Sequence, residues 1–310
     1  MNDDYLRKEL TRLGTLIVTA TGKQIKSIDV MSGGLTNINF KFILEDGFVV
    51  ACRIPGPGTE EYVNRLAEKH NLSIMGILGI SPEIYYYDKA TGTMLSEFIH
   101  GETMHPEDFQ NSKLLLAYAA RVLKKCHTSG FEQADEFDPF RKIEDYNAIL
   151  KSHGYIPEYD NTEELYHQLS RVEDAMLAAG FPKVPCHNDT LSENFMWTGN
   201  SMKLIDWEFS GMNDCYFDLA AFIVENGLSE ECETVFLTAY CGNIPTEKDR
   251  ARILLNKFLL DSFVFHWAMM QLDAGKDRSI YYPYGLERIE RALSYTKDPA
   301  FDRALKLVAE

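Results

Sequence analysis

The chain has 310 residues, of which 45% are hydrophobic and 25% charged, which is ordinary for a soluble globular protein and enough for one large domain or two smaller ones. Its formal net charge of −16 argues against nucleic acid or an anionic membrane surface as a partner, because like charges repel. The same charge favours a cationic substrate, although solubility alone would also account for it.

The cysteines and the N-terminus indicate where the protein works. The six cysteines show no C-x-x-C pair and no cysteine–histidine cluster with zinc spacing, which predicts reduced, mostly buried thiols. The N-terminus reads M-N-D-D-Y-L-R-K-E-L, which is acidic and amphipathic, whereas a secretory signal is basic and then apolar. No apolar run approaches the ~18 residues of a membrane span. We therefore expect a cytoplasmic protein that is not inserted in a membrane.

The first hundred residues are predicted to be rich in strands. Leucines at helical spacing predict an amphipathic helix over residues 3–19. Alternating apolar residues and turn signals then predict strands at 25–31, 38–44, 48–54, 83–87 and 94–99. Helical spacing over 59–78 places one helix among these strands.

From Pro106 onward the signals are nearly all helical. The predicted helices cover 106–128, 142–152, 161–179, 215–241 with a break near Gly227, 246–272 and 281–296. The sequence thus predicts an α+β fold of two lobes, a small strand-rich N-terminal lobe over residues 1–100 and a larger helical C-terminal lobe over 101–310.

A glycine-containing turn follows the first predicted strand. It consists of Ser32, Gly33, Gly34, Leu35, Thr36 and Asn37. The two glycines would let backbone N–H groups approach phosphate oxygens, and the serine, threonine and asparagine could add side-chain donors. A hairpin also uses Gly-Gly for structural reasons alone, so this turn does not by itself identify a phosphate site.

The strand over 48–54 carries a cation that suits a phosphate. Its sequence V-A-C-R places Arg53 where the V-A-I-K strand of protein kinases has the lysine that holds the nucleotide phosphates. Arginine keeps the charge but has a wider, planar head. Glu68 lies on the next predicted helix, where it could pair with Arg53, although a solvated helix face is equally compatible with its position.

The segment V-P-C-H-N-D-T-L-S-E-N-F-M-W-T-G-N-S-M-K-L-I-D-W-E, from Val184 to Glu208, contains the chemistry on which the prediction depends. Asp189 and Asn194 form H-N-D-x-x-x-x-N, and a hairpin turning at 198–200 would return Asp206 towards them. Phosphoryl transfer needs a carboxylate beside the acceptor hydroxyl and oxygen ligands for Mg²⁺. Asp189 is predicted to be the base, and Asn194 and Asp206 the metal ligands. Each of the three also suits a plain turn, but their combination does not.

In their order along the chain, S-G-G-L-T-N, V-A-C-R, a helical Glu, H-N-D-x-x-x-x-N and I-D-W-E resemble the choline/ethanolamine kinase and aminoglycoside phosphotransferase superfamily, and the bacterial choline kinase branch most of all. That branch has the strand arginine, E-N-F after the catalytic loop and an I-D-F-E-Y-A-G-x-N-D segment. This chain has Arg53, Glu193-Asn194-Phe195 and I-D-W-E-F-S-G-M-N-D from Ile205. The resemblance covers about 32–288 and implies a protein-kinase-like bilobal fold that binds ATP at the lobe junction. The adenine would then contact the backbone from Glu97 to Ile99.

The resemblance also implies an acceptor site. A choline-type acceptor carries a quaternary ammonium, which aromatic faces and a nearby carboxylate hold best. The family pattern assigns this role to Glu208, Glu225, Trp267, Tyr284 and Arg288. Relatives often have W-x-x-W on the late helix, where this chain has Val264, so one wall is either missing or supplied elsewhere, for example by Trp207, Phe265 or Tyr281. Core packing remains an alternative for Trp267 and Tyr284.

We therefore predict an ATP- and Mg²⁺-dependent kinase of a small amino-alcohol, with choline as the preferred acceptor. Few residues separate Asp206 from the D-L-A-A-F helix that contains Asp218, and no A-P-E motif follows, which leaves no room for a peptide-docking activation loop. The alternatives are a kinase of ethanolamine, thiamine or an aminoglycoside, and a catalytically inactive nucleotide-binding scaffold. Retention of all three of Asp189, Asn194 and Asp206 counts against the scaffold.

Overall fold

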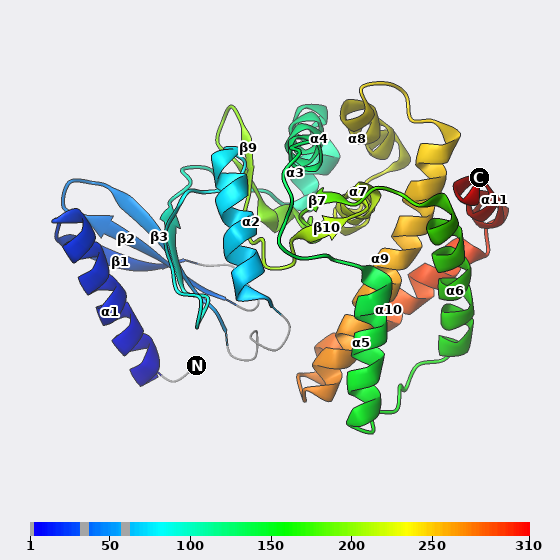
Figure 1. The fold of residues 1–310 in the computed structure, drawn as a ribbon, viewed down its shortest axis with the longest axis horizontal. Coiled ribbons are helices and arrows are strands. Elements are labelled where there is room, and N and C mark those ends of the chain that lie inside the picture. The colour runs from blue at the N-terminus through cyan, green and yellow to red at the C-terminus, as the bar shows by residue number, and fades with distance from the viewer. Residues whose placement is uncertain (1–2, 32–36, 57–62) are drawn as a thin grey trace. The chain divides into compact units, whose positions relative to one another are not determined.

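A computed structural model describes residues 3–31, 37–56 and 63–310. The chain divides into two compact units. The sheet unit contains Met1–Thr103 and Met196–Phe209, and the helical unit contains Met104–Phe195 and Ser210–Glu310. Strands dominate the first and helices the second, so the predicted α+β class is confirmed (Figure 1).

The sheet unit is built on five antiparallel strands in the order β1-β2-β3-β5-β4. These strands are β1 (Ile25–Met31), β2 (Ile38–Leu44), β3 (Val49–Ile54), β4 (Ile84–Tyr87) and β5 (Met94–Glu97). Two helices accompany them, α1 (Asp3–Thr21) and α2 (Arg65–Ile77). All five predicted strands and both predicted helices are present. The helix predicted over 59–78 begins at Arg65 in the described part of the chain, and residues 59–62 of that prediction lie outside it.

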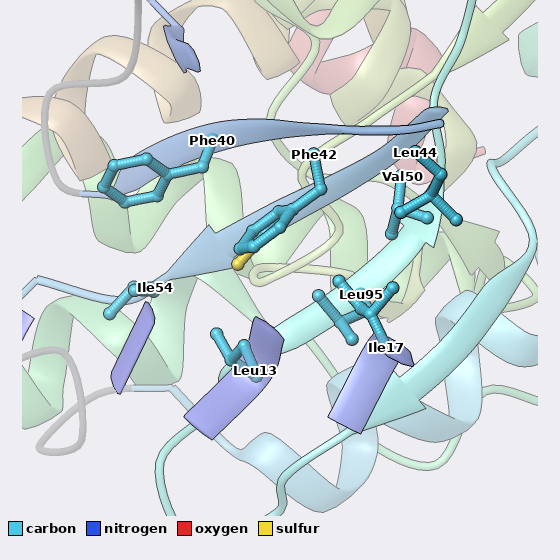
Figure 2. Close-up of a cluster of buried hydrophobic side chains, with 9 residues drawn as sticks. Leu13, Ile17, Phe40, Phe42, Leu44, Val50, Ile54 and Leu95 are labelled. Carbon is cyan, nitrogen blue, oxygen red and sulfur yellow. The ribbon is translucent and has the colours of Figure 1, made fainter. Parts of the chain in front are cut away.

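One face of this sheet forms the core of the unit (Figure 2). Alternation along β2 buries Phe40, Phe42 and Leu44, because successive strand side chains point to opposite faces. Leu13 and Ile17 of α1 face these residues, as Figure 2 shows, and both are almost completely buried. Removing this much apolar surface from water holds α1 on the sheet.

A second, three-stranded sheet has the order β6-β8-β9. It contains β6 (Glu102–Thr103), β8 (Phe195–Trp197) and β9 (Met202–Leu204), and the hairpin between β8 and β9 turns where the sequence predicts. Gly199 has a φ of +90° in this turn, a conformation that favours glycine. Asp206 follows β9 directly, as predicted from the sequence.

The helical unit contains nine α-helices within the part of the chain that the structure describes, and all but one were predicted in some form. They are α3 (Pro106–Asn111), α4 (Lys113–His127), α5 (Pro139–Ser152), α6 (Thr162–Ala179), α7 (Cys215–Glu225), α8 (Glu230–Cys241), α9 (Glu247–Asp273), α10 (Arg278–Thr296) and α11 (Pro299–Ala309). A two-stranded antiparallel sheet pairs β7 (Val184–Cys186) with β10 (Gly211–Asn213), and a short 3₁₀ helix, Ser192–Asn194, follows the loop that contains Asp189.

Two features of this unit differ from the sequence prediction. The helix predicted over 106–128 is two helices, because Ser112 is extended at φ −133° and its side chain caps the second one by accepting from the Leu115 N–H at 3.3 Å. Helix α11 was not predicted, although Asp298 caps it and Pro299 occupies its first turn. The break predicted near Gly227 is present, with that glycine at φ +55°.

Helix α9 is the longest in the helical unit, and by length and composition alone it could cross a membrane. The sequence analysis did not single it out, because Lys257 and Asp261 interrupt its apolar residues. In the structure 67% of its most apolar stretch is buried inside the protein. It also packs against α10, α11, α7 and α5, so it has the burial of a core helix.

Candidate active site

The sheet unit contains a buried pair of opposite charges. Arg53 on β3 is 6% exposed and Glu68 on α2 is 1% exposed, and Arg53 Nη2 lies 2.5 Å from Glu68 Oε1. The predicted pairing of these residues is therefore present. Arg65 Nη1 also donates to Glu68 Oε2 at 2.9 Å, and the Tyr87 hydroxyl donates to the same oxygen. Burial would raise the pKa of Glu68, but the two arginines and Tyr87 hold it below its ordinary value.

The segment after β9 adds two carboxylates to this pair. Asp206 Oδ1 lies 3.4 Å from Arg53 Nη1, and Glu208 Oε2 lies 3.7 Å from Arg65 Nη1. Burial raises the pKa of Glu208 to about 7, and the charge of Asp206 adds to that rise. Asp206 has a φ of +62°, a left-handed conformation that aspartate adopts more readily than most residues. The sheet unit thus gathers four of the predicted site residues, Arg53, Glu68, Asp206 and Glu208.

The other residues predicted to bind the nucleotide lie in two separate segments of the chain. Ser32, Gly33, Gly34 and Thr36 lie outside the described residues, and Asn37 is 6% exposed at the start of the next described segment. Glu97 ends β5, and its N–H donates to Glu83 O at 2.8 Å while its carboxylate accepts from Lys203 Nζ at 2.8 Å. Ile99, two residues further on, is 7% exposed.

The helical unit contains the loop that the sequence predicts to be catalytic. The Asn194 side-chain N–H₂ donates to the backbone oxygen of Asp189 at 2.8 Å and to its Oδ2 at 2.9 Å. These two bonds fix both side chains across the loop. They also leave the Asn194 side-chain oxygen as the part of that amide that suits a hard cation. Asp189 is half-buried, whereas Asn194 is 7% exposed.

Asp218 at the start of α7 anchors this loop. Its carboxylate accepts from the backbone N–H of His187 at 2.8 Å and of Asn188 at 2.6 Å, and the ring of His127 lies 2.9 Å away. The carboxylate is completely buried, so these bonds replace its hydration. Asn188 has a φ of +63°, which turns the chain immediately before Asp189. The sequence analysis gave no role to Asp218 or His127, although an acidic residue inside the apolar run D-L-A-A-F-I was a visible signal.

The residues predicted to hold the acceptor form a second group in this unit. Arg288 donates to both oxygens of Glu225, at 2.6 and 2.8 Å, and to the Tyr284 hydroxyl at 2.7 Å. Its guanidinium also lies 4.7 Å from the centre of the Tyr284 ring. Burial raises the pKa of Tyr284 to about 12, and among the smaller effects Arg288 lowers it while Glu225 and Asp189 raise it. The charge of Asp189 therefore acts on this group.

Aromatic rings flank the same group. The Trp267 ring on α9 meets two tyrosines of α10 edge-on, Tyr281 at 5.8 Å and Tyr284 at 6.3 Å between ring centres. All three side chains are half-buried. Phe265, by contrast, is completely buried. Tyr281, one of the three aromatic residues considered as a substitute for the missing tryptophan, contacts Trp267.

The positions of Trp207 and Glu208 also bear on the predicted acceptor site. Trp207 is completely buried in the sheet unit, where its indole N–H donates to Leu204 O at 3.1 Å. Glu208, assigned to the acceptor by its place in I-D-W-E, lies beside Arg65.

A sheet unit with a buried arginine–glutamate pair, joined to a helical unit with an H-N-D-x-x-x-x-N loop, defines a phosphotransferase of the protein-kinase-like class. Residues 28–261 match the family described as choline/ethanolamine kinase. The chain belongs to that family and is a small-molecule kinase, which confirms the resemblance found in the sequence.

Solved structures agree with this assignment. The chain is 30% identical to a choline/ethanolamine kinase family protein from Mesorhizobium loti, with a TM-score of 0.86 over 98% of this chain and 99% of that one. It is 27% identical to choline kinase LicA from Streptococcus pneumoniae, with a TM-score of 0.77 over 93% and 98% of the two chains. A LicA structure in complex with AMP is 28% identical, with a TM-score of 0.75 over 92% and 96%.

Proposed function

We propose that this kinase transfers the γ-phosphoryl group of ATP to the hydroxyl of choline, giving phosphocholine and ADP. Kinase chemistry follows from the family, and the choice of choline rests on one observation. Trp267, Tyr281 and Tyr284 form an aromatic group whose neighbouring carboxylate, Glu225, already accepts two hydrogen bonds from Arg288. A quaternary ammonium needs aromatic faces and no hydrogen-bond acceptor, so this environment suits it.

Ethanolamine would fit the same environment less well. Its primary ammonium has three N–H donors, each of which loses a water acceptor on binding. Both oxygens of Glu225 are already bonded to Arg288, so the cluster offers such a donor little in return. Choline has no N–H donor to leave unsatisfied. We therefore expect trimethylated acceptors to be preferred.

Asp189 acts in the transfer step as the base. The acceptor oxygen attacks the γ-phosphorus, the bond from that phosphorus to the bridging oxygen breaks, and the hydroxyl proton passes to the Asp189 carboxylate. The two hydrogen bonds from Asn194 support this role, because they hold Asp189 in a single orientation. The bonds from the loop amides to Asp218 fix the backbone on which Asp189 is carried.

Mg²⁺ would be held by Asn194 and Asp206. Both residues offer oxygen atoms, as a hard cation requires, and the side-chain N–H₂ of Asn194 is already committed to Asp189. The Asp206 side chain is 30% exposed, which keeps it accessible to a ligand. When bound, the ion neutralises charge on the phosphates. These donor sets fit Mg²⁺ better than a softer metal.

The nucleotide contacts follow the remaining predicted residues. Arg53, oriented by Glu68, would bind phosphate oxygens, aided by the segment that contains Ser32, Gly33, Gly34, Thr36 and Asn37. The adenine would contact the backbone between Glu97 and Ile99. Because the Glu97 N–H already donates to Glu83, we expect the carbonyl of Glu97 and the N–H of Ile99 to serve there.

We also infer that the enzyme works in the cytoplasm. All six cysteines lie in the described part of the chain, and all six are free thiols, three of them buried. Free thiols persist in a reducing compartment, which is also where ATP is made available.

An acceptor screen tests the proposal. ATP consumption would be measured with choline, ethanolamine, thiamine and an aminoglycoside in the wild type, in Asp189→Asn and in Trp267→Ala. We expect choline to give the highest kcat/KM, with Asp189→Asn slower by about 10²-fold or more because the base is lost. Trp267→Ala should weaken the use of choline by roughly 30-fold, the loss expected for one desolvated cation–π contact, with the KM for ATP nearly unchanged.

Three outcomes of this screen would contradict the proposal. A wild-type preference for the aminoglycoside or ethanolamine would overturn the choice of choline. Equal losses on every acceptor in Trp267→Ala would show that this tryptophan only packs the core. Near-normal turnover in Asp189→Asn would show that Asp189 is not the base.

A further inference from the structure

Two residues that the proposed mechanism does not use complete a buried ion cluster behind the acceptor group. Asp261 on α9 accepts from Arg288 Nη1 at 3.0 Å, and it accepts two further bonds from Arg291, from Nε at 2.8 Å and from Nη2 at 2.6 Å. Arg288 in turn holds Glu225 and Tyr284. The acceptor cluster is defined here as Glu225, Asp261, Arg288 and Arg291.

The charges of the acceptor cluster cancel. It contains two carboxylates and two guanidinium groups, so its formal sum is zero. Asp261 is completely buried and Arg288 is 4% exposed, so little solvent screens either charge. Burial would lower the pKa of Arg288, but Glu225 and Asp261 raise it above its ordinary value, which keeps the group charged. Any change in the balance of charge would therefore act on a neighbouring cation with only partial screening.

Asp261 is the member of the cluster that sets this balance. Without it, two arginines would face Glu225, while Glu287, 3.3 Å from Arg291 Nη1, is 65% exposed and screened by solvent, so a positive charge would remain beside the Tyr284 ring. The same ring is one of those proposed to hold the acceptor's cationic group, so the excess charge would repel the acceptor. Without Arg291, the cluster would be negative by one unit and would attract a cation. The two changes thus act in opposite directions.

We propose that Asp261 is a positioning and specificity-determining residue of the acceptor site, which it makes neutral by pairing with Arg288 and Arg291. The inference rests on the proposed function. It accounts for how an aromatic cage with two arginines nearby still accepts a cation. Asp261 acts through Arg288 and Tyr284 and does not itself contact the acceptor.

The test compares a cation with its uncharged isostere. Choline and 3,3-dimethyl-1-butanol have the same shape, but a carbon replaces the nitrogen in the second. KM and kcat for both would be measured in the wild type, Asp261→Asn, Arg291→Gln and the double variant, with an inhibition constant replacing KM if the neutral alcohol is not turned over. Arg303→Gln on α11, an exposed arginine, provides the change in net charge of Arg291→Gln at a position away from the cluster.

The ratio of the choline KM to the neutral-alcohol constant reports charge alone. It should rise by about tenfold in Asp261→Asn, the effect of one unit charge a few ångströms from the cation in a partly screened site. It should fall in Arg291→Gln and return close to the wild-type value in the double variant. It should stay constant in Arg303→Gln, and kcat should change less than KM in every variant. A purely structural role would alter both acceptors together.

A ratio of the choline KM to the neutral-alcohol constant that rises in Asp261→Asn and falls in Arg291→Gln supports the inference. A ratio that stays constant in both, or moves in the same direction in both, overturns it. If Asp261→Asn does not fold, Arg291→Gln must still lower the ratio, because its side chain is 29% exposed and less dependent on packing. A wild-type enzyme that does not phosphorylate choline would overturn the proposed function and the inference with it, whereas normal choline turnover with unchanged ratios would overturn the inference alone.

Discussion

Two residues of the candidate site have left-handed backbone, which most side chains avoid. Asn188 precedes Asp189, and Asp206 follows β9, with φ values of +63° and +62°. Left-handed backbone at a residue other than glycine costs about 1–2 kcal/mol, and asparagine and aspartate tolerate it best. The bonds from the loop to Asp218 offset that cost at Asn188. These residue types therefore satisfy the backbone and the chemistry together.

Replacing Asp206 by Asn separates its role in the left-handed backbone from its proposed role as a metal ligand. Asparagine tolerates the same φ, so the melting temperature should change little. One charged oxygen ligand is lost, so we expect ATP affinity in Mg²⁺ to fall by about tenfold or more, with affinity in excess EDTA nearly unchanged. Calorimetric titration with and without Mg²⁺ measures both. An unchanged affinity in Mg²⁺ would show that Asp206 does not bind the metal.

His266 on α9 makes stability depend on pH. Its Nδ1 lies 2.7 Å from Ser262 O and its Nε2 lies 3.1 Å from the Tyr166 hydroxyl, and burial lowers its pKa to about 4. In the unfolded chain the pKa returns to about 6.5, so between these two values the unfolded state binds the proton and the folded state does not. Folded stability must then fall as the pH drops through that interval.

The variant His266→Gln should remove this effect. Between pH 7 and pH 5 the free energy of unfolding of the wild type should fall by about 2 kcal/mol more than that of the variant, the size expected for such a depressed pKa. Urea unfolding at both pH values provides the measurement, and taking the difference cancels the carboxylates that both proteins share. Parallel losses in the two proteins would mean that His266 does not stay neutral in the fold.

At the scale of elements, the α9–α10 packing depends on one glycine. A Cβ built on Gly285 would lie 2.6 Å from the Tyr159 hydroxyl oxygen and 3.3 Å from the Cβ of Ala268. Tyr159 is 6% exposed and stacks on Tyr282, so its ring has little room to move. The missing side chain of Gly285 thus permits the close approach of α10 to its neighbours, and α10 carries both tyrosines of the proposed cage.

Gly285→Ala should destabilise the protein by about 1–3 kcal/mol, the usual cost of overpacking a core, despite the better helix propensity of alanine. Removing the hydroxyl with Tyr159→Phe should recover part of the loss in the double variant. Gly76→Ala near the end of α2 is the control, because its Cβ would meet Pro82 O at an ordinary 3.4 Å. Thermal unfolding of the wild type, the three single variants and the double variant provides the measurement. A stabilised Gly285→Ala would show that Tyr159 moves aside without cost.

Elements that carry a long local pattern were predictable from the sequence. The alternation in I-N-F-K-F-I-L fixes β2, and Asn64, whose side chain accepts from the Ala67 N–H, explains why α2 starts at Arg65. Strands β7 and β10 have three residues each, too few to show alternation, and they exist because they pair with one another. Helix α11 has a capping signal, which the sequence analysis did not use.

In the candidate site, too, the residues of a local motif were predictable, whereas those joined by tertiary contacts were not. Residues with fixed chemical spacing, such as Asp189 and Asn194, were found from the motif alone. The anchoring of the catalytic loop by Asp218 joins residues about 30 positions apart, and the role of Asp261 depends on two arginines of another helix. Contacts of this kind follow from tertiary packing, which a single sequence does not display.

For the whole molecule, the relevant property is its charge. The net charge of −16 creates a negative potential that raises the local concentration of cations and lowers that of anions. The acceptor cluster is itself neutral, so attraction of a cationic acceptor would come from the rest of the surface. This long-range contribution differs from the short-range one of Asp261, because salt screens the first strongly and buried charges weakly.

Ionic strength should therefore affect the two acceptors differently. The screening length falls from about 30 Å at 0.01 M to about 10 Å at 0.1 M salt, so most of the surface potential is lost over that range. We expect kcat/KM for choline to fall by about two- to fivefold when KCl is raised from about 0.01 to about 0.3 M at saturating ATP and Mg²⁺. For 3,3-dimethyl-1-butanol, which carries no charge, the same titration should leave kcat/KM nearly constant. Equal slopes for both alcohols would mean that salt acts on the nucleotide or on the fold, and that the acidic surface does nothing to draw in the acceptor.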